Sequence, residues 1–262
     1  MPLRHGRQAS WRALTRPVPD SLQHCELTHV QRAPIDVARA RVQHAAYEHA
    51  LNQLGCNVES VIPAMDMPDS VFIEDTAVVF DELAIIARPG VPSRQRESDA
   101  VAAALARYRR LASISVPATL DGGDVLRVGR DVYVGVSGRT NGDGVRQLAG
   151  LLGPHGYRVH AVETQGCLHL KSAVTCAGDD LLLLNPDWVD ARQFSGLKWI
   201  AVDPGEPSAA NVLLVGGRLL CAASAPRTRS RLENRGLQVT SVDMSEIAKA
   251  EGALTCCSLI VS

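Results

Sequence analysis

The chain has 262 residues, of which 46% are hydrophobic, and a formal net charge of −1 with histidine neutral. We expect one domain, residues 1–262, because no linker or low-complexity stretch divides the chain. The near-neutral charge argues against a nucleic-acid or anionic-membrane partner. The sequence has neither the apolar core of a signal peptide nor an apolar stretch of membrane-spanning length. We therefore expect a cytoplasmic protein. We also expect it to be a monomer or a homodimer.

The seven cysteines are an odd number, irregularly spaced, and none forms a Cys-x-x-Cys motif. This pattern argues against a disulfide framework or a zinc cluster. Two of the thiols, Cys256 and Cys257, are adjacent near the end of the chain. Neighbouring residues of a strand point to opposite faces, so we expect at least one of this pair to be buried packing.

The first elements in chain order are a strand-like segment, Ser10–Val18, and a helix, Ile35–Leu54. Pro34 precedes this helix and Gly55 follows it, which are typical start and stop signals. After the helix, a hairpin of two short strands recurs. The four hairpins span residues 75–87, 124–136, 172–184 and 211–221, and the first strand of a fifth begins at Cys256 or Cys257.

The starts of these hairpins are 49, 48, 39 and 45 residues apart, which is typical of a propeller or another repeat architecture. Helices are predicted between most hairpins, and a further strand follows each helix. The helices are Gln95–Leu111 and Gly144–Leu152, with shorter candidates at Pro186–Phe194 and Arg227–Asn234. The third strands are Asn57–Val61, Leu111–Val116, Tyr157–Val162, Lys198–Val202 and Gly236–Val242.

The repeating module is therefore strand, strand, helix, strand, five times. The fifth hairpin lacks its second strand, and the segment Ser10–Val18 lacks an upstream partner. We predict that these two ends pair and close a ring. A doubly wound sheet is the structural alternative, but it accounts less well for five similar hairpins.

Residues able to carry chemistry stand at the head of each hairpin. They are Glu74-Asp75, Asp121-Gly122-Gly123-Asp124, His169, Asn211 and Cys256. Any one of them alone is more often a turn, a cap or a structural residue. In a closed ring, however, equivalent positions face a common axis. We therefore expect carboxylates, a histidine and a thiol to converge there.

Several of these segments resemble the dimethylarginine dimethylaminohydrolase (dimethylargininase) family of the guanidine-modifying, or pentein, superfamily. The matching motifs are Phe72–Asp75, Leu120–Asp124, His169–Ser172 and Thr255–Ser258, together with Arg88–Arg94 and Gly138–Asn141. The resemblance implies a five-bladed, pseudo-symmetric α/β-propeller. It also implies hydrolysis of Nω-methylated arginines, asymmetric dimethylarginine and monomethylarginine, to citrulline and dimethylamine or methylamine. The implied path passes through a covalent cysteine thiouronium.

The resemblance also implies a role for each site residue. Cys256 is the nucleophile, and Cys257 takes the packing role. His169 is the general acid for the amine and then the base for water, and Asp121 orients it and holds the guanidinium. The substrate-binding residues are Glu74 and Asp75 for the guanidinium, Phe72 as a wall, Asp69 for the α-amino group, Arg94 and Arg139 for the α-carboxylate, and Leu22 and Ala250 at the amino-acid end. No metal or organic cofactor is implied.

The residues themselves suit this chemistry. A guanidinium carbon is a poor electrophile, so attack needs a thiolate, carboxylates to hold the cation and an acid for the departing amine. A bound cation would also help to ionise the thiol, because a nearby positive charge lowers a thiol pKa.

Three alternatives stay open. One is an arginine or agmatine deiminase of the same fold; arginine deiminase typically has an aspartate where this chain has Lys171. An amidinotransferase fits less well in length and motif. The third is a propeller that only binds arginine derivatives. In all cases the polar segment between Leu22 and Arg32 is a plausible lid over the site.

Overall fold

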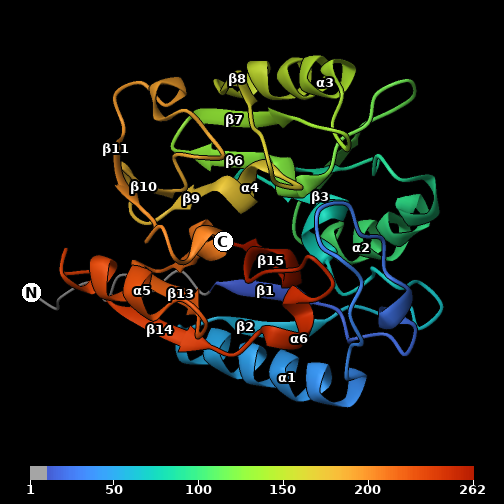
Figure 1. The fold of residues 1–262 in the computed structure, drawn as a ribbon. Coiled ribbons are helices and arrows are strands. Elements are labelled where there is room, and N and C mark those ends of the chain that lie inside the picture. Colours follow the sequence, from blue (N-terminus) through green and yellow to red (C-terminus); the bar gives the residue numbers. More distant parts are fainter. Residues whose placement is uncertain (1–10) are drawn as a thin grey trace, which may run out of the picture.

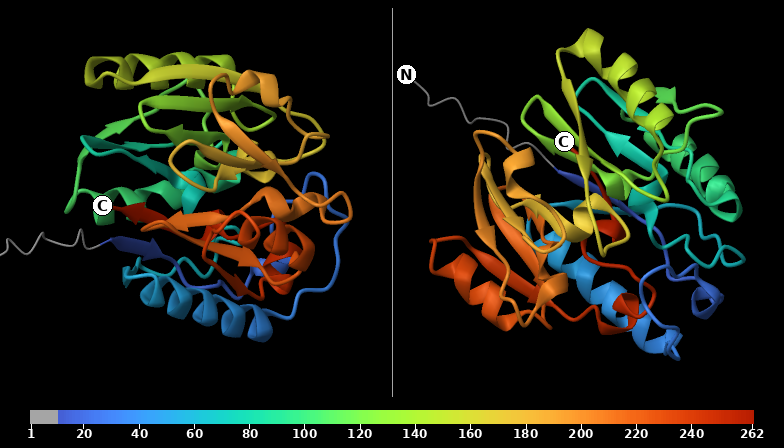
Figure 2. Two further views of the ribbon diagram at one scale, coloured as in Figure 1. Left: turned by 90° about the vertical axis from the view of Figure 1, so that its left-hand side faces the viewer. Right: turned by 45° about the horizontal axis from the view of Figure 1, so that its top comes forward.

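The computed structural model describes residues 11–262, which form five three-stranded sheets arranged around a common axis (Figures 1 and 2). In each sheet the middle strand pairs antiparallel with one neighbour and parallel with the other. The sheets are β15-β1-β2 (Leu259–Val261, Arg12–Thr15, Asn57–Ser60), β3-β4-β5 (Ala77–Val79, Leu83–Ile86, Arg110–Ser113), β6-β7-β8 (Val125–Val128, Asp131–Val136, Arg158–Glu163), β9-β10-β11 (Val174–Cys176, Leu181–Leu184, Lys198–Ala201) and β12-β13-β14 (Leu213–Val215, Arg218–Ala222, Val239–Val242). The predicted five-bladed α/β-propeller is confirmed.

The predicted closure of the ring is confirmed as well. Strand β1 pairs antiparallel with β15, placing Arg12 opposite Val261 and Leu14 opposite Leu259. The other edge of β1 pairs in parallel with β2. The first blade is therefore built from both ends of the described chain. Ser10, the first residue of the predicted strand, lies outside the described residues.

The longer helices lie on the outside of the ring, with α1 and α3 on opposite sides of the molecule (Figure 1). Helix α1 starts where the Asp36 carboxylate accepts a hydrogen bond from the Arg39 N–H at 3.0 Å, and Gly55 follows its end with φ +95°. The helices are α1 Val37–Gln53, α2 Ser98–Leu105, α3 Gly142–Leu152, α4 Leu170–Ala173, α5 Pro226–Glu233 and α6 Ser245–Ala248.

Two helix predictions were wrong in extent or type. The predicted helix Gln95–Leu111 is divided: a 3₁₀ turn, Pro92–Glu97, leads into α2, and Leu111 already belongs to β5. Pairing of Leu111 with Ala84 in the parallel ladder outweighs helix propensity at that end. The predicted helix Pro186–Phe194 is only a 3₁₀ turn at Ala191–Gln193.

The heads of the hairpins are short helical turns rather than strand residues. Glu74 and Asp75 lie in the 3₁₀ turn η2 (Ile73–Thr76), and Cys256 and Cys257 lie in the turn η8 (Thr255–Cys257). The strands begin two or three residues later than predicted in these blades. Hence the prediction that the nucleophile lies on the closing strand itself was wrong, because the chain turns once before entering β15.

Each of the five hydrophobic clusters joins two neighbouring blades. In β3, for example, Ala77 packs with Leu14 and Leu259 of one neighbour, whereas Val78 packs with Val125 of the other. Since both faces of each sheet are covered, the inner strands are mostly apolar, with Arg127 in β6 and Thr175 in β9 as exceptions. The ring is consequently held by five equivalent cores with no open seam.

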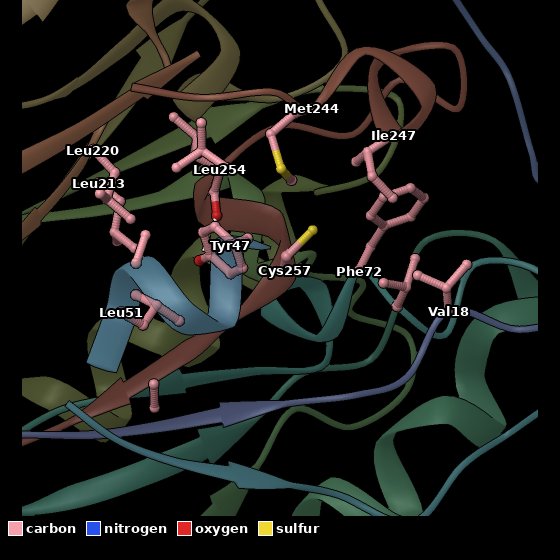
Figure 3. Packing of buried hydrophobic residues seen from close by; sticks show 14 of the residues in the cluster. Val18, Tyr47, Leu51, Phe72, Leu213, Leu220, Met244, Ile247, Leu254 and Cys257 are labelled. Atoms are coloured by element: carbon pink, nitrogen blue, oxygen red, sulfur yellow. Dashed lines mark hydrogen bonds between the residues drawn. The ribbon is translucent and has the colours of Figure 1, made fainter. Parts of the chain in front are cut away.

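Cys257 belongs to the core between the first and last blades (Figure 3). It is fully buried, close to Tyr47, whose hydroxyl donates to the Leu254 carbonyl oxygen at 2.8 Å. The packing role expected for Cys257 therefore agrees with its position. Among residues 11–262, no helix is both long and apolar enough to cross a membrane.

Candidate active site

The turns η2, η8 and η4 (Gly122–Asp124) and the start of α4 bring the expected polar residues together at one end of the axis. His169 precedes α4, and its Nε2 lies 3.0 Å from Asp121 Oδ2. Its Nδ1 lies 3.9 Å from Asp75 Oδ1. A Cβ at Gly123 would lie 2.7 Å from His169 Nδ1, so only glycine allows this close approach.

The electrostatics of His169 suit a proton donor. Burial alone would lower the pKa of His169, but the charges of Asp75 and Asp124 and the hydrogen bond to Asp121 raise it to about 9. The imidazole is therefore protonated at neutral pH. In return, the positive charges of His169 and Arg94 overcome burial and lower the pKa of Asp75 below its ordinary value.

Cys256 is partly exposed and lies beside Glu74 and Asp75, in contrast to the buried Cys257. The protein around its sulfur excludes most of the water, and this desolvation, together with the charges of Glu74 and Asp75, raises the pKa of the Cys256 thiol far above its ordinary value. The thiol is thus protonated when the site is empty. A cation bound to these carboxylates would remove part of that penalty.

Glu74 is held by two blades. Its Oε1 accepts from Lys171 Nζ at 2.7 Å, and its Oε2 accepts from Thr255 Oγ1 at 2.7 Å. Asn211 in turn donates to Thr255 Oγ1 and accepts from the Thr255 N–H, both at 3.0 Å. Asn211 and Thr255 therefore fix the turn that carries Cys256. The sequence alone assigned no role to Asn211 and Thr255, although their position at the heads of hairpins already pointed to the site.

Asp124 is a further residue without an assigned role in the sequence analysis. It is fully buried, and its Oδ1 accepts from the Leu170 N–H at 2.9 Å while its Oδ2 accepts from Ser137 Oγ at 2.7 Å. Because Leu170 follows His169 directly, this bond fixes the backbone beside the imidazole.

The residues expected at the apolar wall and the amino-acid end lie in one cluster. Leu22, Phe72 and Ala250 are buried together, and Cys256 packs against the same group. A Cβ at Gly252 would overlap the Phe72 ring, so the chain passes the ring as closely as a glycine permits.

The two arginines expected to clamp a carboxylate are placed differently. Arg94 is 3% exposed; its Nη1 donates to Asp75 Oδ2 at 2.8 Å, and its Nε and Nη2 donate to the Glu97 carboxylate. Its three nitrogens are thus already bonded to protein acceptors. Arg139 is also buried, but its Nη1 has no hydrogen-bond partner among the described residues and lies 3.9 Å from Asp121 Oδ2. Of these two arginines, Arg139 is the one that keeps a donor without a partner within residues 11–262.

A loop covers this end of the site. Both carboxylate oxygens of Asp69 accept from the Glu26 N–H, at 3.3 and 3.2 Å, and Thr28 Oγ1 accepts from Arg139 Nη2 at 3.2 Å. The Glu251 carboxylate accepts from three consecutive backbone N–H groups of residues 28–30. Burial raises the pKa of Asp69. The structure therefore has the expected lid segment seated on the residues proposed for the amino-acid end.

Asp75, Asp121 and His169 place one potential metal-ligand atom each within 4.8 Å of one another. These atoms already satisfy each other and their neighbours: Arg94 bonds Asp75, and the Gly90 N–H donates to Asp121 Oδ1 at 2.9 Å. The arrangement suits proton transfer beside a held cation without an added ion.

A sequence model of the arginine deiminase family matches residues 22–213. The chain is 43% identical to N(G),N(G)-dimethylarginine dimethylaminohydrolase of Streptomyces coelicolor over 95% of this chain and 96% of the relative. It is 34% identical to the enzyme of the same name from Pseudomonas aeruginosa, over 86% and 89% of the two chains.

Solved structures agree. The Pseudomonas aeruginosa enzyme, as a cysteine-to-serine mutant complexed with citrulline, superimposes with a TM-score of 0.91 at 32% identity, covering 95% of this chain and 98% of that one. A histidine-to-glycine mutant of a dimethylarginine dimethylaminohydrolase, as an adduct with S-methyl-L-thiocitrulline, gives 0.90 at 33% identity over 95% and 99%. This chain belongs to the dimethylarginine dimethylaminohydrolase family.

Proposed function

We propose that this chain hydrolyses Nω-methylated arginines, asymmetric dimethylarginine and monomethylarginine, to citrulline and the corresponding methylamine. The observation that carries the proposal is the convergence of Cys256, Glu74, Asp75 and the protonated His169–Asp121 pair at one end of the propeller axis. Thiol, carboxylates and acid are the groups that substitution at a guanidinium carbon requires.

The substrate guanidinium binds first. Glu74 and Asp75 accept its N–H groups, and Phe72 walls the pocket. Arg139 pairs with the α-carboxylate through Nη1, which has no partner in the described part of the chain. Asp69 takes the α-amino group at the edge of the lid. We had expected Arg94 to share the carboxylate; its bonds to Asp75 and Glu97 instead support a role in orienting Asp75. Leu22 and Ala250 contact the amino-acid end.

Binding of the cation then ionises the nucleophile. It offsets the charges of Glu74 and Asp75, so the raised pKa of Cys256 falls and the thiol proton is lost to solvent. His169 does not accept this proton, because it is already protonated below about pH 9. The thiolate attacks the guanidinium carbon, which forms the Sγ–C bond.

His169 next donates its proton to the methylated nitrogen, and the C–N bond breaks with release of the amine. An S-alkylthiouronium remains on Cys256. The now neutral His169 removes a proton from water, whose oxygen attacks the same carbon, and the Sγ–C bond breaks to leave citrulline. Asp121 stabilises the protonated imidazole in both half-reactions.

The alternative hypothesis is an arginine or agmatine deiminase, which would share this mechanism and differ in substrate. The test is citrulline release from asymmetric dimethylarginine and monomethylarginine and from arginine, and carbamoylputrescine release from agmatine, measured side by side. We expect the methylated arginines to have the largest kcat/KM. Strong preference for arginine or agmatine would overturn the substrate assignment, and binding without any turnover would indicate a non-catalytic propeller. The cytoplasmic location and the monomeric or dimeric state stay predictions.

A further inference from the structure

A cavity of about 270 Å³ lies apart from the candidate active site, where the end of β1 meets the start of α2. Arg16, which follows β1 directly, forms part of its wall. The rest of the wall comes from the segment 62–67, which follows β2, and from residues 96–100, which lead into α2. None of the site residues named above lines this cavity, so it is a separate feature of the molecule.

Arg16 is fully buried, yet most of its hydrogen-bonding capacity is unused within residues 11–262. Its Nη1 donates to the Glu97 carbonyl oxygen at 3.2 Å, whereas Nε and Nη2 have no partner in this part of the chain. These two nitrogens form one edge of the planar guanidinium, and that edge can bind both oxygens of a carboxylate side-on. The side chain therefore offers a complete fork to an oxyanion.

The charge of Arg16 is poorly compensated by the surrounding protein. Its bond to Glu97 goes to the carbonyl oxygen, while the Glu97 carboxylate is bonded to Arg94. Burial lowers the pKa of Arg16 from its ordinary value, and the charge of Glu97 offsets only part of this effect. A buried cation without a paired anion is costly, so an anion on the free edge of Arg16 would stabilise the folded chain.

The other wall residues indicate which kind of anion fits. One further cation, Arg96, and two carboxylates, Asp66 and Asp99, line the cavity, so its formal charges including Arg16 sum to zero. The two carboxylates disfavour a dianion such as hydrogen phosphate, because like charges repel. The remaining wall residues are apolar: Ile62, Pro63, Ala64, Met67 and Ala100. The volume is just below the range of about 300–1,000 Å³ that is typical of sites for drug-sized ligands, so the ligand is a smaller molecule.

We propose that this cavity binds a small monocarboxylate, whose two oxygens pair side-on with Nε and Nη2 of Arg16 and whose short apolar part lies against the wall. Because Arg16 is fully buried, the ligand reaches it when part of the wall moves aside. The segment 62–67 contains neither helix nor strand, and Ile62 is 74% exposed, so this segment can move at little cost. The bound carboxylate lies close to the Arg94–Glu97 ion pair, because both arginines donate to Glu97.

The test titrates the protein with sodium butyrate and follows the Nε–H signals of its arginine side chains by ¹⁵N NMR. The signal of Arg16 is assigned from its absence in Arg16→Met. We expect butyrate to shift this signal in a saturable manner, because Nε–H becomes a donor to the carboxylate. Sodium phosphate at the same pH and ionic strength should bind at least about tenfold more weakly. An Arg16 signal that does not move, or a preference for phosphate, would overturn the proposal.

Two variants locate the bound carboxylate. Arg16→Met removes the fork, and Ala100→Leu narrows the cavity and carries the test if Arg16→Met does not fold, which circular dichroism verifies. Both should weaken butyrate binding at least about tenfold, the loss expected for one hydrogen bond to a charged group. Ala103→Leu is the matched control, because Ala103 is exposed on α2 and does not line the cavity.

A second control separates this cavity from the candidate active site. Arg139 is the other buried arginine with an unpartnered nitrogen in the described part of the chain, so it could also attract a carboxylate. Arg139→Gln and Ala103→Leu should both keep the affinity for butyrate within about twofold. Binding that is lost in Arg139→Gln but kept in Arg16→Met and Ala100→Leu would show that butyrate binds elsewhere and would refute the assignment.

Discussion

Replacing Asp121 with asparagine removes one of the three carboxylates, first among them Asp75, that raise the pKa of His169. The carboxylate lies 3.0 Å from His169 Nε2, and the Gly90 N–H and Arg139 hold it in place. Asparagine keeps the shape but presents a neutral partner to the imidazole. A hydrogen bond to a charged group contributes about 1.5–3 kcal/mol, which corresponds to about one to two pKa units.

The pKa of His169, raised to about 9 in the native site, should therefore fall by about one to two units in Asp121→Asn. At pH 8 the protonated fraction of His169 should then fall from about 90% to about 10–50%, so less imidazolium remains to protonate the amine. We expect kcat to fall by about two- to tenfold at pH 8, with almost no loss at pH 6.

The assay is citrulline formation from dimethylarginine between pH 6 and 10, with an NMR titration of His169 in the free enzyme. Asp131→Asn is the matched control. Asp131 begins β7, and its Oδ1 lies 2.7 Å from Nε2 of His160 on the outer strand β8, so the change also removes a carboxylate beside a histidine, but outside the proposed site. An upper pH limb and a His169 titration that both match the unmodified enzyme would refute the assignment of Asp121.

Four further predictions follow from the site and its surroundings. Cys256→Ser should abolish turnover, whereas Cys257→Ser should keep most of it; steady-state citrulline assays that gave the reverse order would exclude Cys256 as nucleophile. Glu251→Gln weakens the three bonds to residues 28–30, so we expect KM for dimethylarginine to rise about tenfold, equivalent to about 1.4 kcal/mol; an unchanged KM would show that the loop is held otherwise. Tyr47→Phe leaves the buried Leu254 carbonyl without its donor and should cost about 1–3 kcal/mol in urea unfolding. The pKa of His169 is raised from 6.5 to about 9 on folding, so its contribution to stability is complete below pH 6.5 and is lost as the pH rises through 9. We therefore expect this contribution to the free energy of unfolding to fall by about 3 kcal/mol between these pH values. A His169→Asn variant should lack this pH dependence.

The sequence by itself determined the repeat. The inner strands are mostly apolar because most of their side chains are buried between neighbouring blades, and this makes the hairpins visible as runs such as Ala77–Val79 or Leu213–Val215. The spacing of the hairpins, with half a hairpin at each end, predicted the pairing of β1 with β15. The same periodicity showed that the residues able to carry chemistry recur at the heads of the hairpins.

The ends of elements were less predictable, because packing decides them. The alternation argument assigned Cys256 and Cys257 to opposite faces of a strand, but both lie in the turn η8 before β15. The division between a partly exposed Cys256 and a buried Cys257 still holds. Two contacts explain this division. Cys257 packs in the core around Tyr47, and the hydrogen bond from Thr255 to Glu74 fixes the turn that carries both cysteines.

Only the tertiary structure decided which charges meet. Arg94 and Arg139 both stand in matching motifs, yet Arg94 is bonded to Asp75 and Glu97 while Arg139 keeps an unpartnered nitrogen among the described residues. Likewise, the protonation of His169 depends on three carboxylates from two other blades. Sequence periodicity records which face of an element is buried, but ion pairs and pKa shifts depend on distances of a few ångströms between segments far apart in the chain.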